Sequence, residues 1–168
     1  MTSYLLREFT PERLSDVAGQ WEELAGEDEF VVEMATVFAW AESHLVHRDG
    51  DAYALELYDP LTDKAGAILE VVDGRRGTLT KLLKLYVSPE FWNMEQQSDR
   101  LQLIDMHASA YTEIIRVGMD KGVEDVKIYG RTDMMLEILK VLQSTWPTEF
   151  TGTIATMEGR WLRIARGQ

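Results

Sequence analysis

The pattern of apolar and polar residues predicts a strand, a helix and a second strand between residues 78 and 129. Thr78–Val87 is rich in leucine and other strand-forming residues, and Pro89 follows, where the missing N–H ends a ladder. Apolar residues three and four apart then mark one face of a helix: Leu101, Ile104, Ala108, Tyr111, Ile115 and Gly118. Asp125–Tyr129 alternates apolar and polar residues, as strands do. A strand, crossover helix and strand of this length predict a parallel pair.

Hydroxyl and carboxyl side chains before apolar runs predict where the helices begin. The expected caps are, in chain order, Thr10, then Ser98 or Asp99, then Thr132 or Asp133. Pro11 suits a first helical position, and Gly26 and Gly122 suit helix ends. In the last helix one side is expected to be buried, with Met134, Met135, Ile138, Leu139 and Leu142 on it.

The same reading extends to the whole chain. The other predicted elements are a strand at 4–9, helices at 11–25 and 28–45, strands from Ala52 and at 65–72, and strands at 150–157 and 160–165. The predicted order is β-α-α-β-β-β-α-β-α-β-β, an α/β fold. With 168 residues and 45% apolar content, residues 1–168 are expected to form a single domain.

Composition narrows the classes of function. The formal charge of −12 argues against binding to nucleic acid, because a phosphate backbone requires a basic surface. The chain has no cysteine, which excludes disulfides and thiolate metal sites and favours a cytoplasmic protein. It shows no basic, then apolar, leader pattern and no apolar run near the roughly 20 residues that span a bilayer, so no membrane association is expected.

Three phrases in this order carry a resemblance to a known family. They are Leu85-Tyr86-Val87-Ser88-Pro89-Glu90 at the end of a strand, Lys121-Gly122 at the end of a helix, and Tyr129–Leu139, a strand running into a helix. The chain resembles the GNAT superfamily of acyl-CoA N-acyltransferases over nearly its whole length. The resemblance implies a mixed, centrally splayed β-sheet flanked by helices.

The chain departs from that family where the cofactor is held. The family binds the pyrophosphate on backbone amides of a glycine-rich loop at the start of the helix after the splayed strand. Residues 90–100 contain no glycine here, and carry Glu90, Glu95 and Asp99 against one base, Arg100. The family's helical tyrosine, a proton donor, is replaced by Ile138 or Leu139. We therefore expect no cofactor.

Two functions follow from the resemblance and its departures. The first is a non-catalytic structural or interaction protein with a protein partner or a second copy; the chain resembles degenerate GNAT-like proteins of tailed phages, which implies a virion or morphogenesis component. The second is an active acyl-CoA-dependent N-acetyltransferase with an atypical loop. Acetyl-CoA would then lie against the backbone of Leu85, Tyr86 and Val87. A third possibility is a domain that binds another acyl or peptide ligand in the same strand gap.

An acyltransferase needs a base near the attacking amine. Glu56, Glu70, Tyr86 or a water molecule are the candidates, although acids in such strand patterns usually face solvent. His107 stands near Asp105 and Ser109, but helix positions two apart face different directions, so no triad is expected.

Two further groups of residues are candidates for a site. His44 and His47 are three apart and could share a metal ion, but no third ligand is evident and no metal site is expected. Phe91 and Trp92 are apolar residues in a polar connection, where they form either a hydrophobic plug or a contact surface for a partner. The plug is favoured.

Overall fold

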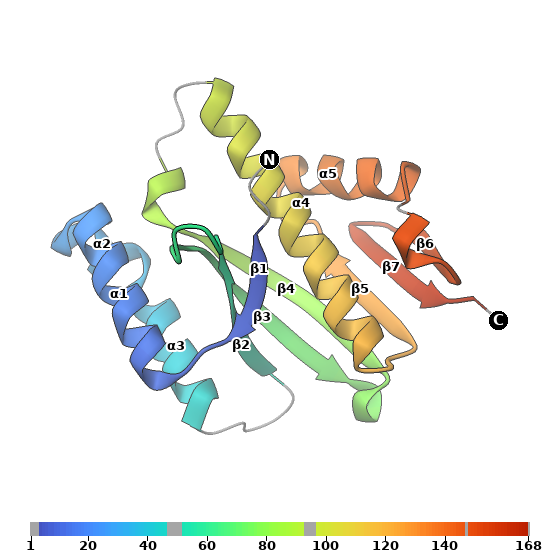
Figure 1. The fold of residues 1–168 in the computed structure, drawn as a ribbon, viewed down its shortest axis with the longest axis horizontal. Helices are drawn as coiled ribbons and strands as arrows, with labels where there is room; N and C mark the ends of the chain where they lie inside the picture. Colours follow the sequence, from blue (N-terminus) through green and yellow to red (C-terminus); the bar gives the residue numbers. More distant parts are fainter. Residues whose placement is uncertain (1–3, 47–51, 93–96, 147, 168) are drawn as a thin grey trace.

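The computed structural model describes residues 4–46, 52–92, 97–146 and 148–167 (Figure 1). The strands are β1 (Leu5–Glu8), β2 (Ala52–Tyr58), β3 (Ala65–Gly74), β4 (Leu79–Val87), β5 (Asp125–Tyr129), β6 (Thr153–Glu158) and β7 (Trp161–Arg166). The helices are α1 (Pro11–Ala25), α2 (Glu27–Glu33), α3 (Ala35–Val46), α4 (Gln97–Asp120) and α5 (Asp133–Ser144). Short 3₁₀ turns lie at Arg75–Gly77, Pro89–Phe91 and Thr148–Phe150.

All seven strands form one mixed sheet in the order β1-β2-β3-β4-β5-β7-β6. Strands β1 to β4 are an antiparallel series, and β4 and β5 are parallel, as predicted. The parallel pairing covers only Leu79–Leu82 of β4, opposite Asp125–Ile128. Residues 83–87 of β4 have no partner in β5, although residues 84–87 still pair with β3. The sheet is therefore splayed at its centre, which confirms the predicted fold class.

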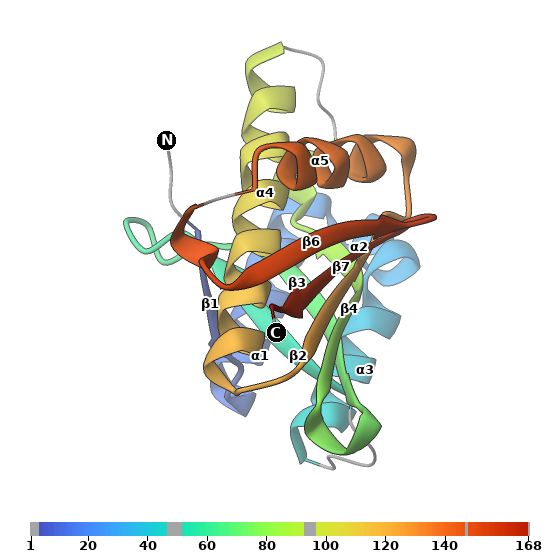
Figure 2. The ribbon, with the colours of Figure 1, turned by 90° about the vertical axis from the view of Figure 1, so that its right-hand side faces the viewer.

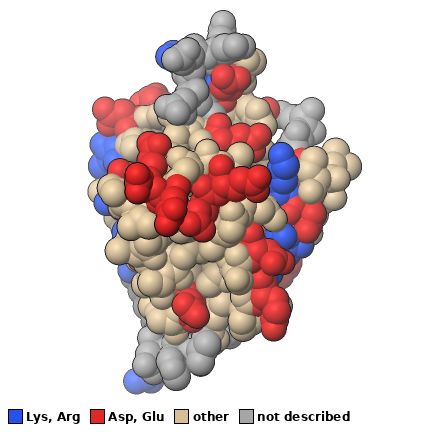
Figure 3. Space-filling view, turned by 90° about the vertical axis from the view of Figure 1, so that its left-hand side faces the viewer, with Lys and Arg blue, Asp and Glu red and all other residues tan. Residues whose placement is uncertain are grey.

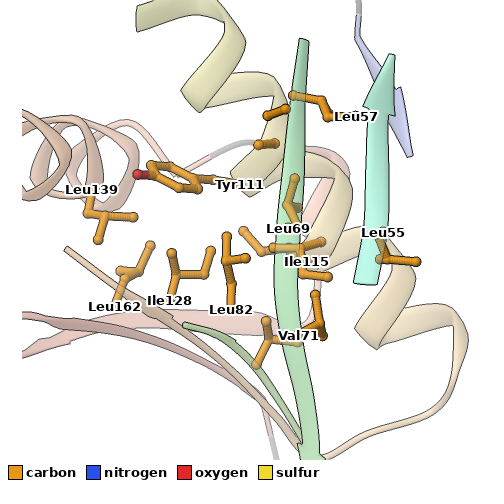
Figure 4. Close-up of a cluster of buried hydrophobic side chains, with 14 of the residues drawn as sticks. Leu55, Leu57, Leu69, Val71, Leu82, Tyr111, Ile115, Ile128, Leu139 and Leu162 are labelled. Atoms are coloured by element: carbon orange, nitrogen blue, oxygen red, sulfur yellow. The ribbon is translucent and has the colours of Figure 1, made fainter. Parts of the chain in front are cut away.

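Helices cover both faces of the sheet (Figures 1 and 2). Helices α1, α2 and α3 pack on one face around Trp21 and Phe38, whose rings meet edge to face at 5.4 Å. Helices α4 and α5 pack on the other face. There Tyr111 and Ile115 of α4 lie over Leu82 and Ile128 of the two parallel strands (Figure 4). Burial of these apolar surfaces provides most of the stabilisation.

Local capping explains two of the helix starts. Thr10 accepts a hydrogen bond from the backbone N–H of Arg13, and Thr132 accepts one from the backbone N–H of Met135. Gly26 ends α1 with a φ of 83°, a left-handed value that suits glycine. These expected caps are confirmed. The cap expected for α4 was wrong, because α4 already includes Ser98 and Asp99.

Residues 28–45 were predicted as one helix, and the structure breaks them at Met34, which has a φ of −122°. The order therefore has three helices between β1 and β2 rather than two. The break lets Phe30 and Phe38 meet at 5.4 Å beside Trp21. As a consequence Val31, expected on the buried side, is 59% exposed.

Candidate ligand cleft in the splayed sheet

A cleft of about 460 Å³ opens where β4 and β5 diverge. It is lined by β4, by α4, by the segment that joins β5 to α5 and by the first turn of α5, through Lys84, Leu85, Tyr86, Val87, Leu103, His107, Arg131, Thr132, Met134 and Met135. The close approach of α5 depends on Gly130, because a Cβ there would lie 3.0 Å from the Cα of Leu136. The structure thus places Leu85, Tyr86 and Val87, the expected cofactor contacts, on the wall of one cleft.

The side chains of adjacent residues of β4 lie on opposite faces of the sheet. Leu85 and Val87 pack with the core under α4, whereas Tyr86 packs with the core under α1 to α3. Lys84 lies opposite Glu70 of β3, and its Nζ is 2.9 Å from Glu70 Oε2. The hydroxyl of Tyr86 donates to the same carboxylate at 3.2 Å. The β4 wall of the cleft therefore carries apolar side chains on the α4 face of the sheet and a paired lysine and tyrosine on the opposite face.

Glu70 was expected to face solvent, and the structure shows it tied to its neighbours instead. Its side chain is 15% exposed and holds the ammonium of Lys84. Hydrogen bonding to Glu70 raises the pKa of Lys84, so the lysine remains a cation. The Glu70 carboxylate is already bonded to an ammonium and a phenol, and it is not among the residues that line the cleft, so it is poorly placed to meet an amine there.

Glu56 was also expected to face solvent, and this was wrong: its side chain is fully buried. Arg7 of β1 donates from Nε at 2.7 Å, and Arg13 of α1 donates from a terminal nitrogen at 2.6 Å. Both arginines also bond Asp63, in the turn between β2 and β3. Glu56 is thus the centre of an ion cluster on β2, and it is not among the residues that line the cleft.

His107 enters the cleft from α4 and is only 3% exposed. Its Nδ1 is 2.9 Å from the carbonyl oxygen of Leu103, and because a carbonyl can only accept, Nδ1 carries the hydrogen. Burial lowers the pKa of His107, so the ring is neutral and Nε2 keeps a lone pair. This is the one cleft group in the described chain with a clear proton-acceptor geometry.

The sequence pattern pointed to the wrong face of α4 at its first turns. Leu101 and Ile104, assigned to the buried face, are 56% and 37% exposed. The buried face instead includes His107, four residues before the fully buried Tyr111. That i to i+4 spacing on one helix was the available signal for His107. The triad excluded from the sequence involves Asp105 and Ser109, for which no hydrogen bond to His107 is found among the described side chains.

The burial of His107 makes stability depend on pH. Because the folded-state pKa lies below the ordinary 6.5, only the unfolded chain gains a proton as the pH first falls below that value. The contribution of the neutral ring is therefore complete above pH 6.5 and is lost progressively as the pH falls toward the folded-state pKa. We expect urea midpoints of the wild type to fall between pH 6.5 and 5 more steeply than those of His107→Phe. Equal slopes would contradict this.

Solved structures of acetyltransferases have a similar fold. An aminoglycoside 6′-acetyltransferase type Ii superposes with a TM-score of 0.52 and 12% identity, over 97% of this chain and 96% of that one. A proposed ribosomal-protein-serine acetyltransferase from Vibrio cholerae gives a TM-score of 0.54 and 10% identity, over 98% and 93%. This chain has the GNAT fold. No protein-family model and no curated protein matches the sequence itself.

In a GNAT fold the segment before α4 is the place expected to hold a pyrophosphate. Residues 93–96, including the expected Glu95, lie outside the described residues. Before them, Phe91 is buried in the core, and the indole Nε1 of Trp92 donates to the carbonyl of Val87 at 3.3 Å. Phe91 and Trp92 thus pack inward, and the indole of Trp92 uses the carbonyl oxygen of Val87 at the end of β4 as its hydrogen-bond acceptor.

The remaining sequence candidates lie elsewhere. His44 Nδ1 is 2.8 Å from the carbonyl oxygen of Trp40, and His47 is outside the described residues. Within the described ranges, no three histidine, aspartate or glutamate side chains are grouped so that they could hold a metal ion. The helices of those ranges include none with the length and apolar character needed to cross a membrane.

Proposed function

We propose that this chain is a GNAT-fold protein that does not transfer acyl groups and that acts as a structural or interaction protein. The observation that carries the proposal is that the two carboxylates expected to act as bases are both held in ion pairs. Glu56 is fully buried between two arginines, and Glu70 is paired with Lys84. The absence of glycine from residues 90–100 supports it further, because bulky side chains keep a diphosphate away from backbone amides.

The surface supports a protein as the partner. Acidic side chains gather over α1 and α2 (Figure 3), among them the exposed Glu22, Glu23, Glu27, Asp28, Glu29 and Glu33. Two apolar side chains stand among them, Val31 at 59% and Val32 at 76% exposed. Such a surface repels phosphate backbones and suits a basic protein surface. With the resemblance to GNAT-like proteins of tailed phages, this supports a virion or morphogenesis component.

Titration with acetyl-CoA tests the proposal directly. We expect no heat of binding and no change in melting temperature up to about 1 mM ligand, since micromolar affinity would stabilise the fold by several kcal/mol at that concentration. An aminoglycoside 6′-acetyltransferase type Ii, titrated in parallel, shows that the ligand and the assay are active. Micromolar binding to this chain would overturn the proposal.

A second candidate is an acyl-CoA-dependent N-acetyltransferase, and the geometry of the cleft favours it. Residues 83–87 present a strand edge without a β5 partner, and the neutral His107 faces the same cleft. When acyl-CoA is bound, the amine attacks the thioester carbon and the C–S bond breaks. His107 Nε2 would take the proton lost by the amine and return it to the thiolate. Release of free thiol from acetyl-CoA with any amine, lost in His107→Gln, would establish this reaction.

A further inference from the structure

The cleft combines apolar walls with one buried acceptor. Its α4 and α5 walls are formed by Leu103, Met134 and Met135, and its β4 wall includes Leu85 and Val87. A volume of about 460 Å³ is that of a small-molecule site. Sites of this kind bind the body of a ligand by apolar contact, and their few polar groups select its chemistry. The polar groups therefore decide what this cleft accepts.

The first polar group is Nε2 of His107. The other ring nitrogen, Nδ1, donates to the carbonyl oxygen of Leu103. Nε2 has no hydrogen-bond partner in the part of the chain that the structure describes. The ring is neutral, so Nε2 can only accept. One turn further along α4, the fully buried hydroxyl of Tyr111 also lacks a partner and points toward Leu139 (Figure 4). Tyr111 is not among the residues that line the cleft, whereas His107 is, so a ligand that offers an N–H or O–H to Nε2 gains a hydrogen bond there.

The second polar group is the guanidinium of Arg131 at the mouth of the cleft. No hydrogen bond or ion pair holds it within the described ranges, whereas the nearby cation Lys84 is already paired with Glu70. Helix α5 begins two residues later, and its N-terminal dipole also favours an anion. Asp133, the acid two residues along the chain, is bonded to Arg160 at 3.2 Å. The mouth of the cleft is therefore locally positive on a protein of charge −12.

We propose that this cleft binds a small carboxylate with an apolar body that also carries a hydroxyl or amide donor. The apolar body lies against Leu103 and Met135, the donor bonds His107 Nε2, and the carboxylate pairs with Arg131. The inference rests on the proposed function, because acyl-CoA in the cleft would exclude such a ligand. A single negative charge suits one free guanidinium, whereas coenzyme A brings several phosphates.

Three probes of one chain length separate the contributions of the polar groups. ω-Hydroxydecanoate has both the hydroxyl and the carboxylate, decanoate lacks the hydroxyl, and decanediol lacks the carboxylate. We expect ω-hydroxydecanoate to bind with a Kd below about 1 mM and roughly fivefold more tightly than either of the others. Isothermal titration with the whole chain measures all three. Absence of binding below about 1 mM, or equal affinity for the three, would overturn the inference.

Variants assign the effects to residues. His107→Leu should remove the preference for the hydroxyl and leave decanoate binding within twofold. Arg131→Gln should weaken both carboxylates by about threefold to fivefold and leave decanediol unchanged. Arg76→Gln is the matched control, since it removes an exposed arginine from the hairpin tip and should change nothing. If His107→Leu kept the hydroxyl preference, His107 would not be the acceptor.

A measurement on the wild type remains decisive if a variant fails to fold. In ¹⁵N-histidine-labelled protein, Nε2 of His107 should give the resonance of an unprotonated nitrogen and move upfield when ω-hydroxydecanoate binds. Decanoate should not move it. An unchanged resonance at saturating ω-hydroxydecanoate would refute the contact. The acetyl-CoA titration tests the proposed function with a different ligand, so failure of the inference can be distinguished from failure of the proposed function.

Discussion

Replacement of Glu56 by glutamine should lower the free energy of unfolding by about 3 kcal/mol. The carboxylate is fully buried, and Arg7 and Arg13 donate to it from β1 and α1. Glutamine keeps the shape but leaves two partly buried cations without their central anion, and the remaining acid, Asp63, is 62% exposed. Removal of one partner from a buried ion cluster is costly because the other charges stay desolvated. Urea unfolding measures the loss, provided that the dependence of the unfolding free energy on urea concentration is the same in the variant and the wild type.

Glu70→Gln is the matched control on the neighbouring strand. Its partner Lys84 is 38% exposed, so water replaces the lost carboxylate and the loss should be about 1 kcal/mol or less. Equal losses in the two variants would show that the Glu56 cluster is solvated. Were Glu56 a catalytic base instead, Glu56→Gln would spare stability and remove acyl transfer, so one variant separates the two roles.

The sequence predicts an element's bounds well where residues close in the chain determine them. Strand β5 has the predicted bounds, Asp125–Tyr129, because alternation and the flanking glycines lie within a few residues. Thr10 and Thr132 cap their helices through bonds to the third residue along. The central splay was implied by the family resemblance, and β4 and β5 confirm it.

The predictions that were wrong depend on partners far along the chain. The burial of Glu56 follows from Arg7 and Arg13, which stand 49 and 43 residues away. Periodicity assigns Glu56 to one face of β2, but it cannot say that α1 covers that face with an arginine. The place of His107 in the cleft was not predicted for a related reason. The first turns of α4 extend beyond the sheet (Figure 1), and there Leu101 and Ile104 are 56% and 37% exposed although they continue the apolar pattern.

Gly118 of α4 should tolerate no side chain, although glycine is a poor residue in the middle of a helix. A Cβ at this position would overlap Cγ2 of Val126 on β5 and would lie 3.4 Å from Val123. The gain in helix propensity, about 1 kcal/mol, is outweighed by overpacking, so Gly118→Ala should lose about 2 kcal/mol of stability. Gly19, exposed within α1 and with no atom within 4 Å of its Cβ position, is the matched control. Gly19→Ala should gain about 0.5 to 1 kcal/mol.

A double-mutant cycle identifies the cause of that loss. Val126→Ala alone removes buried methyl groups and should be destabilising, but combined with Gly118→Ala it also removes the overlap with Cγ2. The two losses should therefore sum to about 1 to 2 kcal/mol more than the loss of the double variant. Strict additivity would mean that α4 moves away from β5 to admit the methyl group. Such a shift would also move His107 on the same helix, and with it the α4 wall of the cleft.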